Sequence, residues 1–303
     1  MSDLPPPGVN AWRLLLRRGP AKISLCVLVV VVAAAVLVPI FLPASYKGLS
    51  NIQFSPPSLR HPFGTDLSGH DVFYRVLIGA RISLLVGIAG ALISLFIGTA
   101  YGLVSGYAGG AVDGVMMRAV EILYSIPRLI VIIVAIGACD PYLAAWLYRH
   151  GMGGLAGYSR IIILVFSLGI IEWLTMARIV RGQVLSLKSL QFVAAARGLG
   201  QSHVKIIVRH LLPNITGIIV VYLTLTIPAV ILDESFLSFL GLGLQEPQVS
   251  WGLLLADAAQ VINPIHSYWW LLLFPAVAMS GTLLAFNFLG DALRDVLDPR
   301  GRR

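Results

Sequence analysis

The residues of this chain with the clearest potential for chemistry are ionisable side chains inside long apolar segments. Glu121 and Arg128 are seven positions apart, so a helix would place them on one face, about 10 Å apart along its axis. Ionisable groups at such depth in a membrane often mark a pathway for substrates or protons, so both are candidates for lining a pore. The alternative, which we favour, is local pairing of Glu121 with Arg118, three positions earlier.

Three further acidic residues occur in or beside apolar segments. Glu172 is expected near the end of a short segment, with Arg178 as its partner. Asp233 and Glu234 follow Pro228, and Glu234 is a candidate for a structural or gating role. A proton relay through these carboxylates is the alternative that the residue types leave open.

The chain lacks the residue patterns typical of a metal site, a protease or an ATPase. Its six histidines have no ligand spacing, and His203 and His210, which would share a helix face, would need a third ligand. No Ser-His-Asp or His-Glu-x-x-His arrangement lies in an apolar segment. No Gly-Lys dipeptide occurs, so the chain has no phosphate-binding P-loop. We expect no metal, no cofactor and no catalytic residue in this chain.

The elements that must position these residues are membrane-spanning helices. The chain is 57% hydrophobic and 12% charged, whereas a soluble globular protein is about 25% charged. About 20 consecutive apolar residues cross a bilayer. The predicted fold is an all-α, polytopic membrane protein with six transmembrane helices, at residues 23–42, 82–105, 115–138, 161–177, 215–239 and 268–289.

The distribution of basic residues predicts the orientation of these helices. One side carries 15 basic residues: Arg13, Arg17, Arg18, Lys22, Arg118, Arg178, Arg181, Lys188, Arg197, Lys205, Arg209, Arg294, Arg300, Arg302 and Arg303. The other side carries six: Lys47, Arg60, Arg75, Arg81, Arg149 and Arg160. Basic residues concentrate on the cytoplasmic side, so we expect both termini and the 178–213 loop in the cytoplasm. Because this distribution accounts for the net charge of +8, no nucleic-acid partner is expected.

Small residues recur at every fourth position along the second predicted helix. They are Gly90, Ser94, Gly98, Gly102 and Gly106. Small side chains on one helix face allow the backbone of another helix to approach closely. We therefore expect this face to pack against another helix, either of this chain or of a partner.

The segment 192–214 is polar and rich in small residues, and its pattern predicts two short helices joined by a hinge. Gly198 and Gly200 would break the first helix, and Ser202 can cap the second. Pro213 is expected to mark the end of the second helix. Each helix has apolar or small residues at positions i, i+3, i+4 and i+7, namely Phe192, Ala195, Ala196 and Leu199, then Val204, Ile207, Val208 and Leu211. The pattern alone fits both a hairpin on the lipid surface and a docking site for another protein.

This segment resembles the cytoplasmic loop of importer-type ATP-binding-cassette permeases. The family pattern is Glu-Ala-Ala, three residues, Gly, nine residues, then a hydrophobic residue, any residue, Leu and Pro. Here Ala194-Ala195-Ala196 precedes Gly200, and His210-Leu211-Leu212-Pro213 follows at the family spacing. Ala194 stands where the family has Glu, and His210 stands where it has a hydrophobic residue.

Other segments carry the same resemblance and narrow it to the peptide-transporting branch. They are His61-Pro-Phe-Gly-Thr-Asp66, Ala177-Arg-Ile-Val-Arg-Gly-Gln183, Glu234-Ser-Phe-Leu-Ser-Phe-Leu-Gly-Leu-Gly243, Glu246-Pro247 with Ser250-Trp-Gly252, and Phe286-Asn-Phe-Leu-Gly-Asp291. Together they cover most of residues 61–303. The chain resembles the C-type subunit of the two paired dipeptide or oligopeptide permeases, whereas residues 139–160 resemble no part of the family.

The resemblance implies one half of a peptide importer that works by alternating access. Expected partners are a second, homologous permease subunit, two ATPases that bind the ATP and Mg, an extracytoplasmic peptide-binding protein and the lipid bilayer. It further implies a bacterial inner-membrane location, an N-terminal part at 1–60 with one helix, and a five-helix permease core at 61–303 with a coupling loop at 178–213. The residues expected to couple to the ATPases are Phe192, Ala194, Ala195, Ala196, Arg197, Leu199, Gly200, His210, Leu211 and Pro213.

Two other functions remain as alternatives. One is a permease of the same subclass for nickel or another small solute. The other, from a different class, is a secondary transporter coupled to protons through Glu121, Glu172 or Glu234. A two-helix docking loop favours the ATP-driven importer, because a proton-coupled carrier does not need one.

Overall fold

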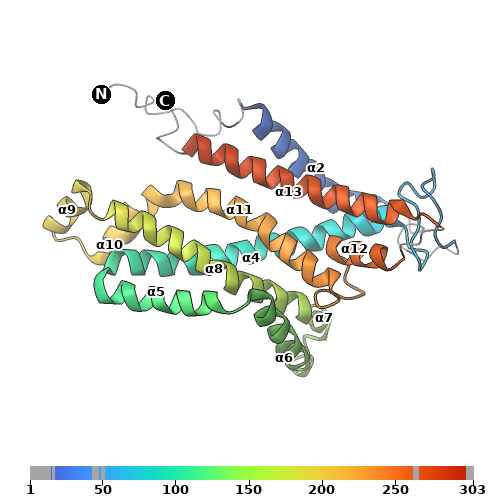
Figure 1. Cartoon of the computed structure of the whole chain (residues 1–303), viewed down its shortest axis with the longest axis horizontal. Helices are drawn as coiled ribbons and strands as arrows, with labels where there is room; N and C mark the ends of the chain where they lie inside the picture. The colour runs from blue at the N-terminus through green and yellow to red at the C-terminus, as the bar shows by residue number, and fades with distance from the viewer. Residues whose placement is uncertain (1–14, 16–17, 43–47, 49–51, 262–265, 298–303) are drawn as a thin grey trace.

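The computed structural model describes residue 15, residues 18–42, residue 48, residues 52–261 and residues 266–297. Within them the chain is helical, and no strand occurs (Figure 1). The helices are α2 (Gly19–Phe41), α4 (Val72–Ala108), α5 (Gly110–Ser125), α6 (Arg128–Arg149), α7 (Gly153–Ala156), α8 (Ser159–Leu187), α9 (Gln191–Gly198), α10 (His203–Ile206), the π-helical turn η1 (Ile207–Leu211), α11 (Leu212–Phe239), α12 (Trp251–Gln260) and α13 (Trp269–Leu297).

Six helices in the described part of the chain are long and apolar enough to cross a membrane. They are Gly19–Phe41, Val72–Ala108, Arg128–Arg149, Ser159–Leu187, His203–Phe239 and Trp269–Leu297. The predicted fold class, an all-α polytopic protein with six spans, is confirmed. Several helices extend well beyond the predicted bounds, because polar residues at their ends continue the helix outside the apolar stretch.

The third predicted span, 115–138, is wrong as a single helix. The helix breaks at Ile126 and Pro127, which separate α5 from α6. A residue before proline is disfavoured in the helical conformation, and Ile126 accordingly has an extended backbone, with φ −79° and ψ 131°. The membrane-length helix here is α6, which continues to Arg149.

Helices α4 and α8 pack backbone to backbone, and this contact confirms the expectation for the small-residue face. A Cβ atom built on Gly98 would lie 2.6 Å from the Met176 Cβ, and one on Gly102 would lie 2.5 Å from the Ala177 carbonyl oxygen. Gly106 is similarly close to Val184, at 2.8 Å. The partner helix therefore belongs to this chain.

The remaining helices surround the α4–α8 pair. Helix α11 packs on α4, where a Cβ on Gly87 would lie 2.5 Å from Ile231. Helices α2 and α13 lie side by side on one flank, and α5 runs along the opposite flank (Figure 1). Helix α6 diverges from the bundle, while α9 and α10 form one end of the molecule and α12 lies toward the other (Figure 1).

The close α4–α8 contact predicts the effect of adding a single methyl group. Gly102→Ala should lower the free energy of unfolding by about 1–3 kcal/mol, since the nearest atoms are backbone atoms that cannot move aside cheaply. The thermal midpoint of the purified protein in detergent measures this effect. The control is Gly182→Ala in α8, where a Cβ would meet nothing within 4 Å. Equal midpoints for the two variants would contradict the close contact.

Candidate functional site

The coupling loop joins two spans through short helices and a glycine hinge. Helix α9 follows α8 after three residues, and Gly200 then takes a left-handed conformation with φ +72°. Glycine adopts this conformation at little cost, which explains the break. The Ser202 side chain accepts a hydrogen bond from the Lys205 backbone N–H and caps α10. The predicted break at Gly200 and the predicted cap at Ser202 are both confirmed.

The predicted end of the second short helix at Pro213 is wrong. Helix α10 continues through the π-helical turn η1 into α11, so one helical run extends from His203 to Phe239. Pro213 lies in the first turn of α11, where the missing N–H of proline is tolerated. The coupling loop is therefore continuous with the fifth span, without a flexible joint at the proline.

The loop divides its apolar residues between the protein interior and its own surface. Ala196 and Leu211, both among the residues expected to couple to the ATPases, are 4% and 0% exposed and pack in a core with Val193 and Ile206. Their side chains form an inward face that holds the loop helices on the spans, which rules out direct contact of these two side chains with a partner. The exposed apolar side chains, which we call the loop surface, are Phe192, Leu199, Val204 and Val208.

The other predicted loop residues are exposed or hold the loop together. Ala194, Ala195, Arg197 and Pro213 are exposed. His210 is half-buried, and its Nε2 lies 2.9 Å from the Gln201 side-chain oxygen. This contact joins the second helix of the loop to the hinge, so His210 acts within the loop.

The loop is also attached to the end of α4. The Tyr107 hydroxyl lies 2.8 Å from His203 Nδ1, and the Arg197 guanidinium lies over the Tyr107 ring at 5.1 Å. Lys188, just after α8, donates a hydrogen bond to the Gly106 carbonyl oxygen at 2.8 Å. The loop is therefore held against the end of α4 by contacts from both of its short helices.

An ion pair braces the same end of the bundle. Arg181 on α8 donates two hydrogen bonds to Asp113 on α5, at 2.6 and 2.7 Å, and Ser105 on α4 donates a third at 2.5 Å. The bidentate geometry is among the strongest for an ion pair. The hydrogen bonds from Arg181 hold the pKa of the Asp113 carboxyl below its usual range, against the opposing effect of burial.

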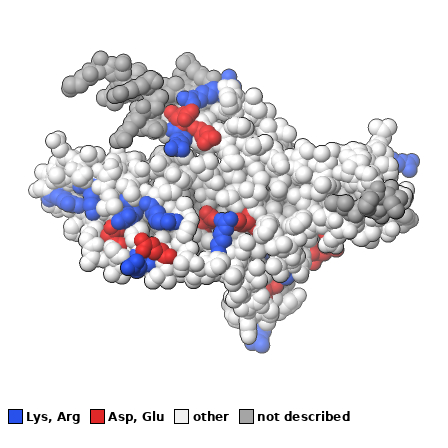
Figure 2. All heavy atoms as spheres, viewed as in Figure 1, with Lys and Arg blue, Asp and Glu red and all other residues white. Residues whose placement is uncertain are grey.

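A second charged cluster lies where α6, α8 and α11 meet. Arg128 Nη2 is 3.0 Å from Asp233 Oδ1, and Arg128 Nη1 is 3.6 Å from Glu172 Oε1. We call these three residues the central triad. In Figure 2 a small group of charged side chains lies midway along the visible face, between mostly uncharged surfaces. A cavity of about 540 Å³ adjoins the triad and is lined by both Arg128 and Glu172.

The predicted pairing of Glu172 with Arg178 is wrong. Helix α8 extends to Leu187, so Glu172 lies near its middle, and residues six positions apart face different sides of a helix. Arg178 instead lies over the Tyr124 ring at 4.0 Å. The triad itself was missed because spacing along one segment cannot pair residues from three helices. The available signal was the presence of ionisable residues in each of three apolar segments.

The remaining acidic candidates have different surroundings. Glu121 lies 3.4 Å from Arg118, as the local alternative expects, and both side chains are largely exposed. Glu234 is fully buried, and its carboxylate accepts a hydrogen bond from Ser238 at 2.8 Å, with Ser83 and Ser235 at 3.4 Å. This serine cage fits a structural role for Glu234, and a gating role stays a prediction.

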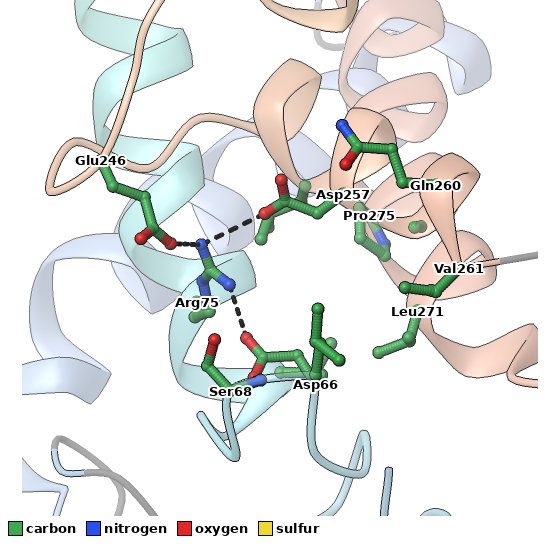
Figure 3. A pocket seen from close by; sticks show the side chains of 13 residues that line it. Asp66, Ser68, Arg75, Glu246, Asp257, Gln260, Val261, Leu271 and Pro275 are labelled. Atoms are coloured by element: carbon green, nitrogen blue, oxygen red, sulfur yellow. Dashed lines mark hydrogen bonds and ion pairs between the residues drawn. The ribbon is translucent and has the colours of Figure 1, made fainter. Parts of the chain in front are cut away.

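The end opposite α9 is held by a buried arginine, as Figure 3 shows. Arg75 on α4 donates hydrogen bonds to Asp66 at 2.5 Å, Glu246 at 3.0 Å and Asp257 at 3.4 Å. A cavity of about 230 Å³ lies beside them. Burial raises the pKa of the Asp257 carboxyl, and the Arg75 charge opposes that rise. Two of the segments that carry the family resemblance, at 61–66 and 246–252, are joined here.

Comparisons with known proteins agree with this arrangement. The family model described as "Binding-protein-dependent transport system inner membrane component" matches residues 98–303. The oligopeptide transport system permease protein OppC of Escherichia coli strain K12 is 47% identical over 297 residues, which cover 97% of this chain and 91% of the relative. The dipeptide transport system permease protein DppC of Bacillus subtilis strain 168 is 44% identical over 295 residues, covering 97% and 86%. The chain therefore belongs to the family of inner membrane components of binding-protein-dependent transport systems.

Proposed function

We propose that this chain is the permease subunit of an ATP-driven importer that moves oligopeptides or dipeptides across the bacterial cytoplasmic membrane. Its similarity to oligopeptide and dipeptide permeases over nearly the whole chain supports the peptide substrate. ATP hydrolysis is assigned to separate ATPase subunits, which also bind the Mg. A nickel or other small-solute permease of the same subclass is the alternative that a substrate assay would reveal.

The observation that carries this proposal is the loop surface. Leu199 is 81% exposed and Val204 is 70% exposed, although their loop is otherwise well ordered by hydrogen bonds and a buried core. A rigid loop that exposes apolar side chains is suited to contact with a protein partner. Because α9 follows α8 and α10 continues into α11, force applied by an ATPase at this surface would tilt both spans.

The proposed assembly follows from the orientation of the chain in the membrane. The α9 end, which carries most of the basic residues, faces the cytoplasm together with both termini. Arg13, Arg17, Arg300, Arg302 and Arg303 of the α9-end count, and Lys47 of the other side, lie outside the described residues. Two ATPases bind on the cytoplasmic side, a second homologous permease subunit completes the pathway, and a peptide-binding protein docks at the opposite end. The division into an N-terminal part at 1–60 and a core at 61–303 belongs to the same proposal.

Reconstitution tests the proposed function directly. The chain, assembled in liposomes with the products of the genes encoded beside it, should take up peptide only with ATP, and peptide should stimulate hydrolysis.

Leu199→Glu should reduce the amount of ATPase retained by the purified permease at least about tenfold, because it places a charge in an apolar contact. Leu59→Glu is the matched control, an exposed leucine in the segment before α4, at the other end of the molecule. Uptake without ATP would contradict the proposal, as would full ATPase retention by Leu199→Glu.

The hinge predicts a separate effect on coupling. Gly200→Val should leave ATPase binding in place and uncouple hydrolysis from uptake, because a β-branched residue resists the φ of +72°. The number of peptides imported per ATP hydrolysed is the measurement, and we expect it to fall several-fold, from a strain of about 1–2 kcal/mol. Gly198→Val is the control, since both glycines have open space around them but only Gly200 has a positive φ. A ratio equal to wild type in Gly200→Val would rule out the hinge.

Ala194 stands where the family has glutamate, so we expect a glutamate at this position to be tolerated. Ala194→Glu should keep ATPase retention within about twofold of wild type, because Ala194 is exposed and a glutamate there can reach Arg197 at the i+3 position. Copurification of the ATPase subunits measures this. A clear loss of the ATPase would mean that the loop surface includes the position of Ala194 and docks in a different orientation.

A further inference from the structure

We propose that Glu172 and Asp233 form a cation-binding subsite in the translocation pathway. Arg128 occupies this subsite in the present structure, and the α-ammonium group of the peptide displaces it during transport. This inference rests on the peptide import proposed above and assigns to it a point of substrate recognition that lies within the permease itself.

The position of the central triad places it at membrane depth. Glu172 lies near the middle of α8, and the other two members come from the start of α6 and from α11. The Arg128 side chain is 54% exposed. An arginine at this depth is costly against lipid, so the exposed face must meet water or another protein chain. The adjoining cavity of about 540 Å³ is within the usual size range of ligand sites.

Arg128 holds its two carboxylates more loosely than the other arginines of the bundle hold theirs. Arg181 and Arg75 donate well-formed hydrogen bonds to their acidic partners. Among the described residues, the ion pairs of Arg128 at 3.0 and 3.6 Å are without a corresponding hydrogen bond. Its side chain is also the most exposed of the three. The acids therefore hold a cation that another cation can replace.

The charges of the triad decide which end of a peptide it binds. A peptide carboxylate about 4 Å from Arg128 would lie about 7 Å from both acids, so one attraction and two repulsions nearly cancel. An ammonium group between the acids gains two attractions at short range against one more distant repulsion. It also has three N–H donors, enough to reach Glu172 and Asp233 together. The subsite thus favours the amino terminus of the peptide.

Throughout the exchange one cation remains between the two carboxylates. When the ammonium group enters between the carboxylates, the Arg128 side chain swings into the cavity, where more than half of its surface already lies open. When the peptide leaves, Arg128 returns and prevents two unpaired carboxylates from remaining at membrane depth. Because Arg128 competes with the ammonium group for the two carboxylates, peptide binding is weak and reversible. A peptide that passes through the pathway must be released again, which weak binding allows.

The test compares uptake of trialanine with uptake of N-acetyl-trialanine, which lacks the ammonium group. The whole transporter is reconstituted in liposomes, and each peptide is supplied at the concentration that gives equal occupancy of the isolated binding protein. The ratio of the two uptake rates then reports on the permease. Three forms are compared with wild type, namely Arg128→Gln, the uncharged triple variant Arg128→Gln/Glu172→Gln/Asp233→Asn, and the control Asp295→Asn.

The variants should change the ratio in opposite directions. Arg128→Gln should raise the preference for free trialanine, because the competing cation is gone. The triple variant, which leaves no unpaired charge to disturb folding, should reduce the preference about tenfold, as expected for loss of charged hydrogen bonds. Asp295, paired with Arg18 at the α9 end, lies far from the triad, and its variant should keep the wild-type ratio.

Two results would overturn the inference. A wild-type ratio in both triad variants would mean that the triad does not recognise the amino terminus. An equal fall in Arg128→Gln and in the triple variant would mean that recognition of the amino terminus requires Arg128, whereas the proposed exchange has Arg128 compete with the amino terminus. In either case ATP-dependent uptake of trialanine by the wild-type protein still tests the proposed function separately, because it does not depend on the ratio.

Discussion

The backbone contact between α4 and α8 is the constraint on which the rest of this structure depends. Gly98, Gly102 and Gly106 leave no room for a side chain, so the two helices approach as closely as their backbones allow. Helix–helix association in lipid receives little help from the hydrophobic effect, and close van der Waals contact must replace it. The pair then serves as a fixed support. Helix α11 packs on α4, α5 is tied to α8 by Asp113 and Arg181, and the coupling loop is attached to the ends of both helices.

In the proposed function, this support would carry a movement at the loop to the central triad. The loop follows α8 on one side and continues into α11 on the other, and the central triad joins these same two helices to α6. A tilt of α11 against α8 therefore changes the separation of Asp233 and Glu172, the two carboxylates that hold Arg128. Loop and triad are coupled through continuous helices, without the need for a chain of loosely packed side chains between them.

The sequence predicted those features that follow from local rules. The small-residue face, the break at Gly200 and the cap at Ser202 each depend on the preferences of one residue or one helix face. It could not predict features that depend on packing between segments. The inward face of the coupling loop, which buries Ala196 and Leu211, looks the same in sequence as its outward face. The partner of Glu172 was also out of reach, because Arg128 and Asp233 come from other helices.

The three arginine clusters differ in a way that suits alternating access. At the α9 end, Arg181 forms a bidentate pair, and at the opposite end Arg75 is buried among three carboxylates. Breaking either cluster would leave a buried charge without a partner, since the Arg75 and Asp113 side chains are 8% and 11% exposed, so both ends resist opening. In the cluster between them Arg128 is 54% exposed, and its ion pair with Glu172, at 3.6 Å, is longer than any ion pair of the two end clusters. A pathway with rigid ends and an exchangeable centre can hold a cargo briefly in the middle while the energy to open one end comes from a partner protein.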